Sequence, residues 1–199
     1  MRPGIVLHHV IFLVVLATIG TFSGGKALAE VRDYFTAGQD PETWQFLIHV
    51  DNYHTNKVML RIREGNMTHA LLEVQYTLDR FPNHPRGLIF METVGNLVGV
   101  PEMAINYYEN ALGFYPQYAL THAQFGKYLS DMGKIKLAIE HLSHAVEMDR
   151  KLAPAFAWLA EAQYKNNNLE LAKKAGIQAR ALGYKGEFPY EGSTGMPKK

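Results

Sequence analysis

The sequence predicts an all-α protein, a right-handed α-solenoid of about four helix–turn–helix units with an N-terminal covering helix. Small residues recur at a spacing of 34 residues, in Ala70, Ala104, Ala138 and Ala172 and again in Gly65, Gly99 and Gly133. A recurring unit of this length is typical of a helical pair that cannot bury its apolar face alone and stacks on copies of itself. The alanines are expected where two helix axes approach closely, and the glycines in the turns.

Residues 1–29 have the pattern of an export signal. Arg2 gives a weakly positive start, an apolar stretch of 13 residues runs from 10 to 22, and Ala27-Leu28-Ala29 matches a small-x-small cleavage site. We therefore expect cleavage after Ala29 and a periplasmic location. The alternative is an uncleaved helix that anchors the protein in the inner membrane, although the apolar stretch is shorter than the roughly 20 residues that a spanning helix needs.

Residues 30–50 are expected to form an N-terminal segment with a capping helix. Asp40-Pro41-Glu42 predicts the helix start, with Asp as the N-cap, Pro at the first helical position and Glu in the first turn. Trp44, Leu47 and Ile48 follow at helical spacing. The helix is expected to cover the exposed core of the first unit, because the end unit of a solenoid needs such a cover.

The repeat domain is expected over residues 51–186. Its four units are placed at 51–84, 85–118, 119–152 and 153–186. Each unit reads as a first helix, a turn that contains Gly or Asn, and a second helix, because these two residues tolerate the left-handed conformation that ends a helix. The first helix of unit one is expected to be short and to start near Thr55. Several Pro and Gly residues in 187–199 predict an irregular tail.

The repeated residues resemble the tetratricopeptide repeat. Unit three matches best, with Phe125-Gly126 at the Leu-Gly pair, Gly133 in the turn, and Ala138 and Ala145 in the second helix. Unit one matches least, because it has Thr77 where the last Ala is expected. The stretch from Tyr76 to Pro85, with Tyr53-His54 upstream, also resembles a group of small exported bacterial repeat proteins. The resemblance implies a helical repeat fold whose usual role is to bind other proteins.

Composition excludes several functional classes. Without residues 1–29 the chain has 18 basic and 19 acidic side chains, so a nucleic-acid-binding face and a polybasic membrane patch are not expected. There is no cysteine, which excludes disulfides, thiolate nucleophiles and cysteine-bound metals. The sequence contains no Gly-x-Ser-x-Gly, phosphate-binding glycine loop or His-Glu-x-x-His motif. We therefore predict that the protein is not an enzyme and carries no cofactor or dedicated metal.

Two histidines leave a metal-handling alternative open. His141 and His144 lie three residues apart and share a helix face, and Glu140 or Glu147 is near enough in sequence to supply an acid. Two histidines without a third ligand make a weak and unselective site. We favour ordinary helix-surface residues over a metal site.

The resemblance also implies a binding surface, because the first helix of each tetratricopeptide unit lines the concave face through five inward positions. The same positions contain Thr55, Ala123, Ser130 and Ala157. As candidate residues of a partner-binding groove we single out Met59, Arg63, Arg86, Ile89, Thr93, Asn96, Leu97, Lys127, Asp131, Glu161, Tyr164 and Lys165. This mixture of apolar, amide and singly charged side chains suits an extended or helical segment of a protein. It lacks the paired Lys and Arg cluster that would clamp a terminal carboxylate.

The resulting hypothesis is a non-enzymatic adaptor or scaffold in the bacterial periplasm, which binds a segment of an exported or membrane-associated protein in the groove. One alternative is an accessory subunit of a membrane complex, anchored by the uncleaved N-terminal helix. The other is the weak histidine-based metal-handling protein described above. Neither nucleic acid nor a small-molecule substrate is expected as a partner.

Aromatic residues crowd the end of unit two, and they divide into core and surface by their spacing. Tyr108 and Phe114 lie at positions that usually fill the core between helices, and both are expected to be buried. Tyr107 and Tyr118 are expected to be exposed, where aromatic residues favour protein interfaces.

Overall fold

The computed structural model describes residues 30–191. The export signal predicted for residues 1–29 lies outside the described residues, as does the end of the predicted tail, residues 192–199. Every regular element of the described residues is helical, so the all-α prediction is confirmed. The elements are η1 (Ala37–Gln39), α1 (Pro41–Tyr53), η2 (Thr55–Lys57), α2 (Val58–Arg63), α3 (Met67–Arg80), α4 (Pro85–Leu97), α5 (Met103–Phe114), α6 (Ala119–Asp131), α7 (Ile135–Met148), α8 (Ala153–Lys165) and α9 (Leu169–Ala181).

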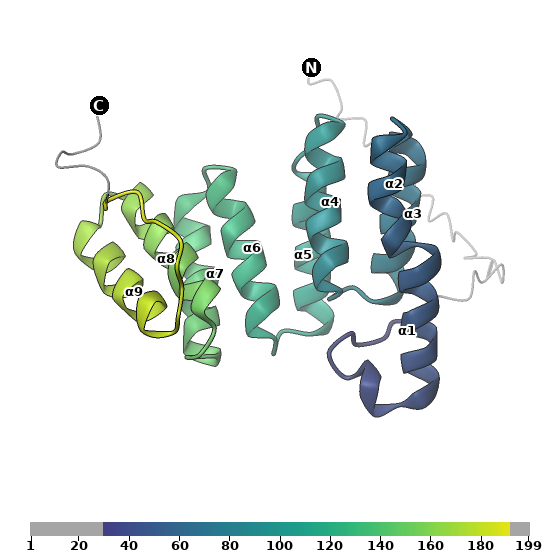
Figure 1. The fold of residues 1–199 in the computed structure, drawn as a ribbon, viewed down its shortest axis with the longest axis horizontal. Helices are drawn as coiled ribbons and strands as arrows, with labels where there is room; N and C mark the ends of the chain where they lie inside the picture. Colours follow the sequence, from purple (N-terminus) through teal and green to yellow (C-terminus); the bar gives the residue numbers. More distant parts are fainter. Residues whose placement is uncertain (1–29, 192–199) are drawn as a thin grey trace, which may run out of the picture.

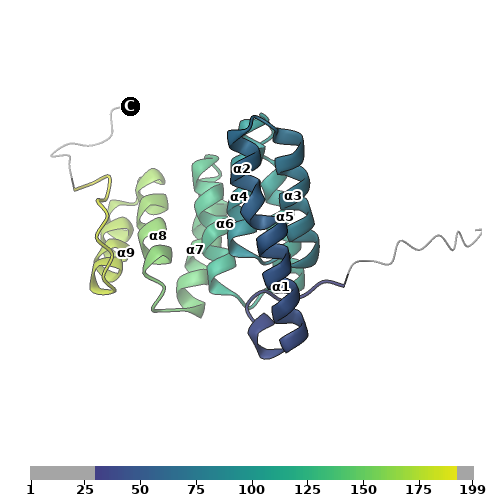
Figure 2. The same ribbon diagram turned by 45° about the vertical axis from the view of Figure 1, so that its right-hand side comes forward.

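The helices stand side by side in chain order as a curved stack of antiparallel pairs (Figures 1 and 2). The pairs are α2–α3, α4–α5, α6–α7 and α8–α9, and each pair contacts the next one along the chain. This arrangement is the predicted α-solenoid. Among residues 30–191, no helix combines the length and apolar character needed to cross a membrane.

The turns within the pairs have the left-handed backbone expected from their sequence. The φ angles of Gly65, Gly99 and Gly133 are 72°, 77° and 75°, and Asn167 has a φ of 60° in the last unit. These values are costly for most side chains but open to Gly and, less easily, to Asn. The period of 34 residues therefore fixes the places where the chain reverses.

Close approach between paired helices depends on the small residues. Ala70, Ala104, Ala138 and Ala172 are all 1% exposed or less. Gly126 on α6 is tighter still, because an added Cβ would lie 2.6 Å from Leu142 Cγ on α7. The small residues at these positions are enclosed between helices, so they offer no side chain to a partner.

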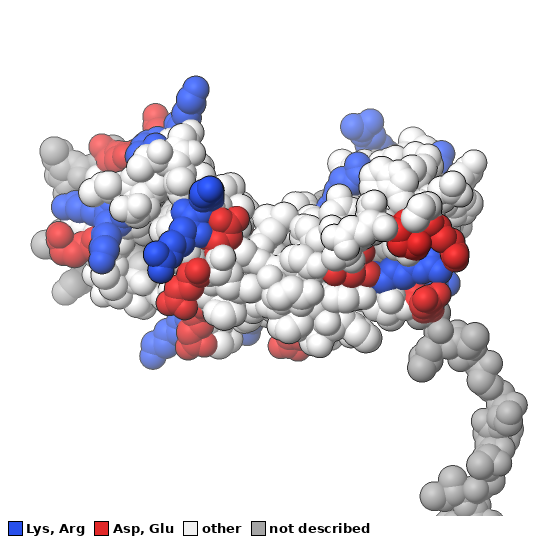
Figure 3. All heavy atoms as spheres, turned by 90° about the horizontal axis from the view of Figure 1, so that it is seen from below, with Lys and Arg blue, Asp and Glu red and all other residues white. Residues whose placement is uncertain are grey.

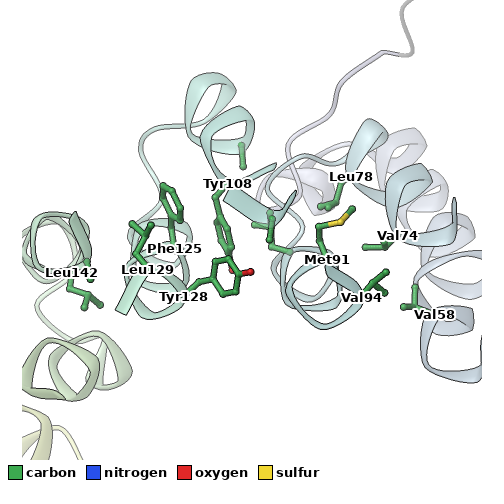
Figure 4. Packing of buried hydrophobic residues seen from close by; sticks show 14 of the residues in the cluster. Val58, Val74, Leu78, Met91, Val94, Tyr108, Phe125, Tyr128, Leu129 and Leu142 are labelled. Atoms are coloured by element: carbon green, nitrogen blue, oxygen red, sulfur yellow. The ribbon is translucent and has the colours of Figure 1, made fainter. Parts of the chain in front are cut away.

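One continuous apolar core runs through most of the stack (Figure 4). It passes from Val58 and Val74 through Met91 to Tyr108 and Phe125, where the second and third units meet. The ring of Tyr108 stacks on that of Phe125, with 5.0 Å between their centroids. Aromatic packing therefore joins the two halves of the solenoid.

The N-terminal segment ties loops of different units together. The hydroxyl group of Tyr118 and the side-chain amide of Asn83 both donate hydrogen bonds to the carboxylate of Asp33, the second at 2.7 Å. The ring of Phe35 lies 4.2 Å from that of Tyr118, centroid to centroid. The segment thus connects the α3–α4 loop with the α5–α6 loop.

Helix α1 begins as the sequence predicts, since the Asp40 carboxylate accepts a hydrogen bond of 2.8 Å from the backbone N–H of Thr43. Its buried residues, Leu47 and Val50, pack with Phe81 and so cover the loop end of the first unit. Trp44 is 48% exposed on the outer side. The first helix of unit one is short, as expected, and consists of η2 and α2.

The structure differs from the sequence predictions at Phe114 and in the tail. Tyr108 is fully buried as predicted, but the prediction for Phe114 is wrong, because its side chain is 52% exposed. Phe114 is the last residue of α5, and the residue 34 positions later, Met148, is also exposed, so this position faces outward. In the tail, Phe188 is buried and packs with Tyr190 against α8 and α9.

We predict that the Gly126→Ala substitution destabilises the protein by about 1–3 kcal/mol, because the new methyl group overlaps Leu142 in a closely packed pair. Gly113→Ala on α5 is the matched control, since an added Cβ there meets no atom within 4 Å. That variant should gain about 0.5–1 kcal/mol from helix propensity. Midpoints of urea unfolding measure both changes, and equal shifts for the two variants would contradict the prediction.

Candidate functional site

The first helices of units two to four, α4, α6 and α8, form a row in which α4 contacts α6 and α6 contacts α8. We call the surface formed by their exposed side chains the inner face. Seen from below, the molecule is hollowed between its two ends, with Lys and Arg side chains on both flanks of the hollow (Figure 3). Charged side chains are therefore concentrated at the flanks of the hollow.

Two lysines and one aspartate bridge α6 and α8. The ammonium group of Lys127 donates to both carboxylate oxygens of Asp131, at 2.8 and 2.6 Å. Lys165 on α8 donates to the hydroxyl and carbonyl oxygens of Ser130, at 3.0 and 3.2 Å, and lies 3.6 Å from Asp131. Both cations are thus held by groups of the protein itself.

Glu92 is a residue of this site that the sequence reasoning missed. It lies on α4 and accepts a hydrogen bond from the hydroxyl group of Tyr108 on α5. Burial raises the pKa of Glu92 to about 7, and the negative charge of Asp131 adds to this, while the Tyr108 hydrogen bond and Lys127 act in the opposite direction. A carboxyl group on the inner face therefore changes its charge near neutral pH.

The repeat itself contained a signal for Glu92. The equivalent residues of the four units, 34 positions apart, are Val58, Glu92, Gly126 and Ala160. Three of these are uncharged residues in the close contact between paired helices. Glu92 is the one charged residue of the set, and a comparison between units at this position would have identified it.

Glu161 and Tyr128 are also partly removed from solvent. Burial raises the pKa of Glu161, and the nearby Lys127 and Lys165 only partly offset this. Burial also raises the pKa of Tyr128 to about 12, with a smaller contribution from Glu92. The Tyr128 hydroxyl group donates to the carbonyl oxygen of Pro101, and Figure 4 shows the ring next to that of Tyr108. The acids of the inner face are therefore incompletely solvated and incompletely neutralised.

All twelve predicted groove residues retain exposed surface, but the structure gathers only some of them. Lys127, Asp131, Glu161 and Lys165 come together at the junction of α6 and α8. The α4 residues Ile89, Thr93, Asn96 and Leu97 lie along one helix of the row, and Tyr164 lies on α8, its ring 6.0 Å from that of Tyr190.

The remaining candidates are placed differently. Arg86 donates to Asp51 of α1 at 2.9 Å. Met59 and Arg63 lie on α2, whose main contacts are with α3 and η2, so they are not gathered with the charged set. Four other residues at the inward positions are buried and offer no surface to a partner: Thr55, Ala123, Ser130 and Ala157.

The histidines form a cluster of a different kind from a metal site. The Nδ1 atoms of His122 and His141 are 3.1 Å apart, and Nε2 of His122 lies 3.0 Å from the carbonyl oxygen of Pro116. Because His122 Nε2–H donates to that carbonyl, its Nδ1 accepts the proton of His141. Burial lowers the pKa of both rings, and His144 contributes in the same direction. Within residues 30–191, no three His, Asp or Glu side chains are grouped so as to hold a metal ion.

A second hollow lies between α5 and α7, on the side of the second helices. This cleft has a volume of about 520 Å³ and is lined by Ile105, Glu109, Leu112, Gly113, Phe125, Leu129, Lys134, Leu137 and His141. Its walls are mainly apolar, and it brings together fewer polar groups than the inner face. The inner face, where charged groups from three units come together, is the better candidate for recognition that depends on charge.

These features define an α-solenoid with the fold of tetratricopeptide-repeat proteins and a polar inner face. Solved structures share the fold: PilF of Pseudomonas aeruginosa matches with a TM-score of 0.55 and 16% identity over 69% of this chain and 63% of that chain. MamA from Desulfovibrio magneticus RS-1 gives a TM-score of 0.51 and 17% identity over 72% and 75%. YrrB, described as a TPR protein with an unusual peptide-binding site, gives 0.50 and 18% over 63% and 65%.

Identities this low show a shared fold and nothing further. No protein-family profile matches the sequence, and no curated protein is detectably similar to it. The resemblance to the tetratricopeptide repeat that the sequence suggested is thus confirmed at the level of the fold.

We predict that the charge on Glu92 destabilises the folded protein as the pH rises. The pKa of Glu92 is about 7 in the folded state and about 4.5 for a free side chain, so the folded state holds the proton more tightly between these values. Stability should fall from about pH 4.5 to above pH 7, and Glu92→Gln should remove this component and be more stable by about 1–3 kcal/mol at pH 8.

Urea unfolding of both proteins between pH 5 and pH 8 measures this difference. The lowered pKa values of His122 and His141 act in the opposite sense, by reducing stability on acidification below about pH 6.5. Since both proteins contain these histidines, subtracting the two curves isolates Glu92. Parallel curves for the wild type and E92Q would contradict the prediction.

Proposed function

We propose that this protein is a non-enzymatic adaptor that binds a segment of another protein on the inner face. The observation that carries the proposal is the convergence of Glu92, Lys127, Asp131, Glu161 and Lys165, from three successive units, on one row of helices. Residues at the repeated positions serve packing and turns, whereas these residues differ from unit to unit. Differences of this kind are what a specific partner can read.

The composition of the inner face supports a protein partner. Ile89 and Leu97 are 45% and 56% exposed on α4, which also carries the amide of Asn96, and the neighbouring helix α6 carries the charged pair of Lys127 and Asp131. Apolar anchors with separate hydrogen-bonding groups suit a peptide segment better than a uniformly charged polymer. The absence of cysteine and of nucleophile motifs from the sequence favours binding over catalysis.

The proposal is tested by recovery of partners from a periplasmic extract of the native host. The variant R86A/N96A/K127A/Y164A removes four inner-face side chains from three units and should reduce recovery of a specific partner at least about tenfold. The control variant N106A/K136A/E140A/K174A truncates four exposed residues of the second helices α5, α7 and α9 and should leave recovery unchanged. Equal recovery by the wild type and the inner-face variant would refute the proposed binding surface.

We further propose that the protein acts in the periplasm after cleavage of residues 1–29. The support is the sequence of that segment, with its short apolar stretch and the Ala27-Leu28-Ala29 site. The mass of the protein purified from the native host should correspond to a chain that begins at Glu30. A mass that includes residues 1–29 would instead favour the membrane-anchored accessory subunit.

A further inference from the structure

The carboxyl group of Glu92 accepts fewer hydrogen bonds from the protein than its oxygens can. Among residues 30–191 its one hydrogen-bond donor is the hydroxyl group of Tyr108, which reaches Oε1. No cationic side chain of these residues forms an ion pair with it. A carboxylate accepts about four hydrogen bonds, so most of its acceptor capacity is open. On α4 it shares a face with Ile89 and Asn96, three residues before and four after it, which places it on the inner face.

The two lysines of the inner face are held by groups other than Glu92. Lys127 is bound by both oxygens of Asp131, and Lys165 is bound by Ser130 and approaches Asp131. The three carboxyl groups of the set, Glu92, Asp131 and Glu161, face two ammonium groups. One negative charge is therefore left over when all three are ionised, and it lies in a setting with reduced solvation.

Gln124 on α6 is a second polar side chain whose hydrogen bonding is incomplete. Its side chain is 7% exposed and lies one turn before Lys127 on α6. Its Nε2 donates to the carbonyl oxygen of Pro85 at 3.2 Å, whereas its buried Oε1 has no hydrogen-bond partner. A buried carbonyl oxygen without a donor is rare in folded proteins. This oxygen lies within the contact between α6 and the start of α4, about two helical turns before Glu92, so it is not itself a contact for a partner.

We infer that the inner face receives a basic side chain, Lys or Arg, of the partner segment, and that its cation binds the Glu92 carboxylate. This inference rests on the proposed function, because it names the partner chemistry that the same surface recognises. An ammonium group supplies three donors and a guanidinium group five, which matches a surface with surplus acceptors. An anionic segment would meet the unpaired carboxylate and be repelled. The exposed side chain of Ile89, three residues before Glu92 on the same face of α4, offers apolar surface for the stem of the long basic side chain.

The geometry gives this interaction a pH signature. The titratable and charged groups that face Glu92 are Tyr108 from α5 and Lys127, Tyr128 and Asp131 from α6. Because Glu92 has a pKa of about 7 in the free protein, it is mainly protonated at pH 6 and mainly ionised at pH 8. Binding of a cation to the carboxylate releases the remaining protons, so affinity rises with pH over this range.

The experiment selects peptides from a phage-displayed library of random 12-residue sequences on the purified protein. We expect enrichment of sequences that contain Lys or Arg at a shared position. The selected peptide is then synthesised with that residue and with a neutral counterpart, citrulline for Arg or norleucine for Lys. The wild type should bind the basic peptide about 10- to 100-fold more tightly than the neutral one, a ratio typical of a charge-assisted hydrogen bond.

Two variants assign the discrimination to Glu92. E92Q keeps the side-chain shape and should bind both peptides with similar affinity, without the rise between pH 6 and pH 8. E140Q removes an exposed acid on α7, and its discrimination should match that of the wild type. Circular dichroism of each variant verifies that the helices are intact before binding is measured.

The possible failures are distinguishable. Selected peptides without a basic residue, or a preference for the basic peptide that persists in E92Q, would overturn the inference and leave the proposed function standing. Peptide binding that is unaffected by R86A/N96A/K127A/Y164A, or no enrichment over an unrelated protein, would refute the proposed function, and the inference would fall with it.

Discussion

Tyr108 is fully buried where α5 meets α6, and its hydroxyl group donates a hydrogen bond to Glu92 on α4. A buried phenol needs a hydrogen-bond partner, and a carboxyl group this far from water needs a donor. The hydrogen bond between them therefore lowers the free-energy cost of burying both polar groups. The ring of Tyr108 also stacks on Phe125 of the next unit, so this one side chain couples the core to the inner face. The position of the charged site depends on the packing of the joint between units two and three.

The same joint explains why the units are packed unequally. At the equivalent position of unit three, Gly126 lets α6 lie directly against α7, and these two helices make the most extensive contacts of the stack. Unit two places the larger Glu92 side chain there, and α4 and α5 contact each other less extensively. A charged residue at a packing position reduces stability, because burial removes part of its solvation. The helix pairs of units three and four therefore contact each other more extensively than the pair of unit two, in which the packing position holds a charged side chain.

The fold could be predicted from the sequence because its signal is periodic and local. Ala138 and Gly133, with their counterparts in the other units, mark helix contacts and turns by spacing alone. Contacts between distant segments carry no such signal, and the hydrogen bond from Tyr118 to Asp33 spans 85 residues. The inner-face residues were predicted from positions that usually point inward. Glu92 is not at one of these positions. The repeat marks it as the one charged residue at a packing position, and the structure adds the buried hydroxyl group of Tyr108 that holds it.

The charge distribution also limits the kind of specificity that this surface can have. Lys127 and Asp131 neutralise each other on α6, so they add little long-range attraction for a charged partner. Their ion pair is instead a fixed dipole on the inner face. A partner cation at Glu92 would neutralise the remaining charge of a group of side chains that folding has already partly desolvated. Binding would therefore require little further reorganisation. Selectivity would then come from the mismatch that any other side chain leaves, namely the Glu92 carboxylate without a cationic donor. Under the proposed binding mode, the incomplete neutralisation of Glu92 would both reduce the stability of unit two and let it discriminate between partner segments.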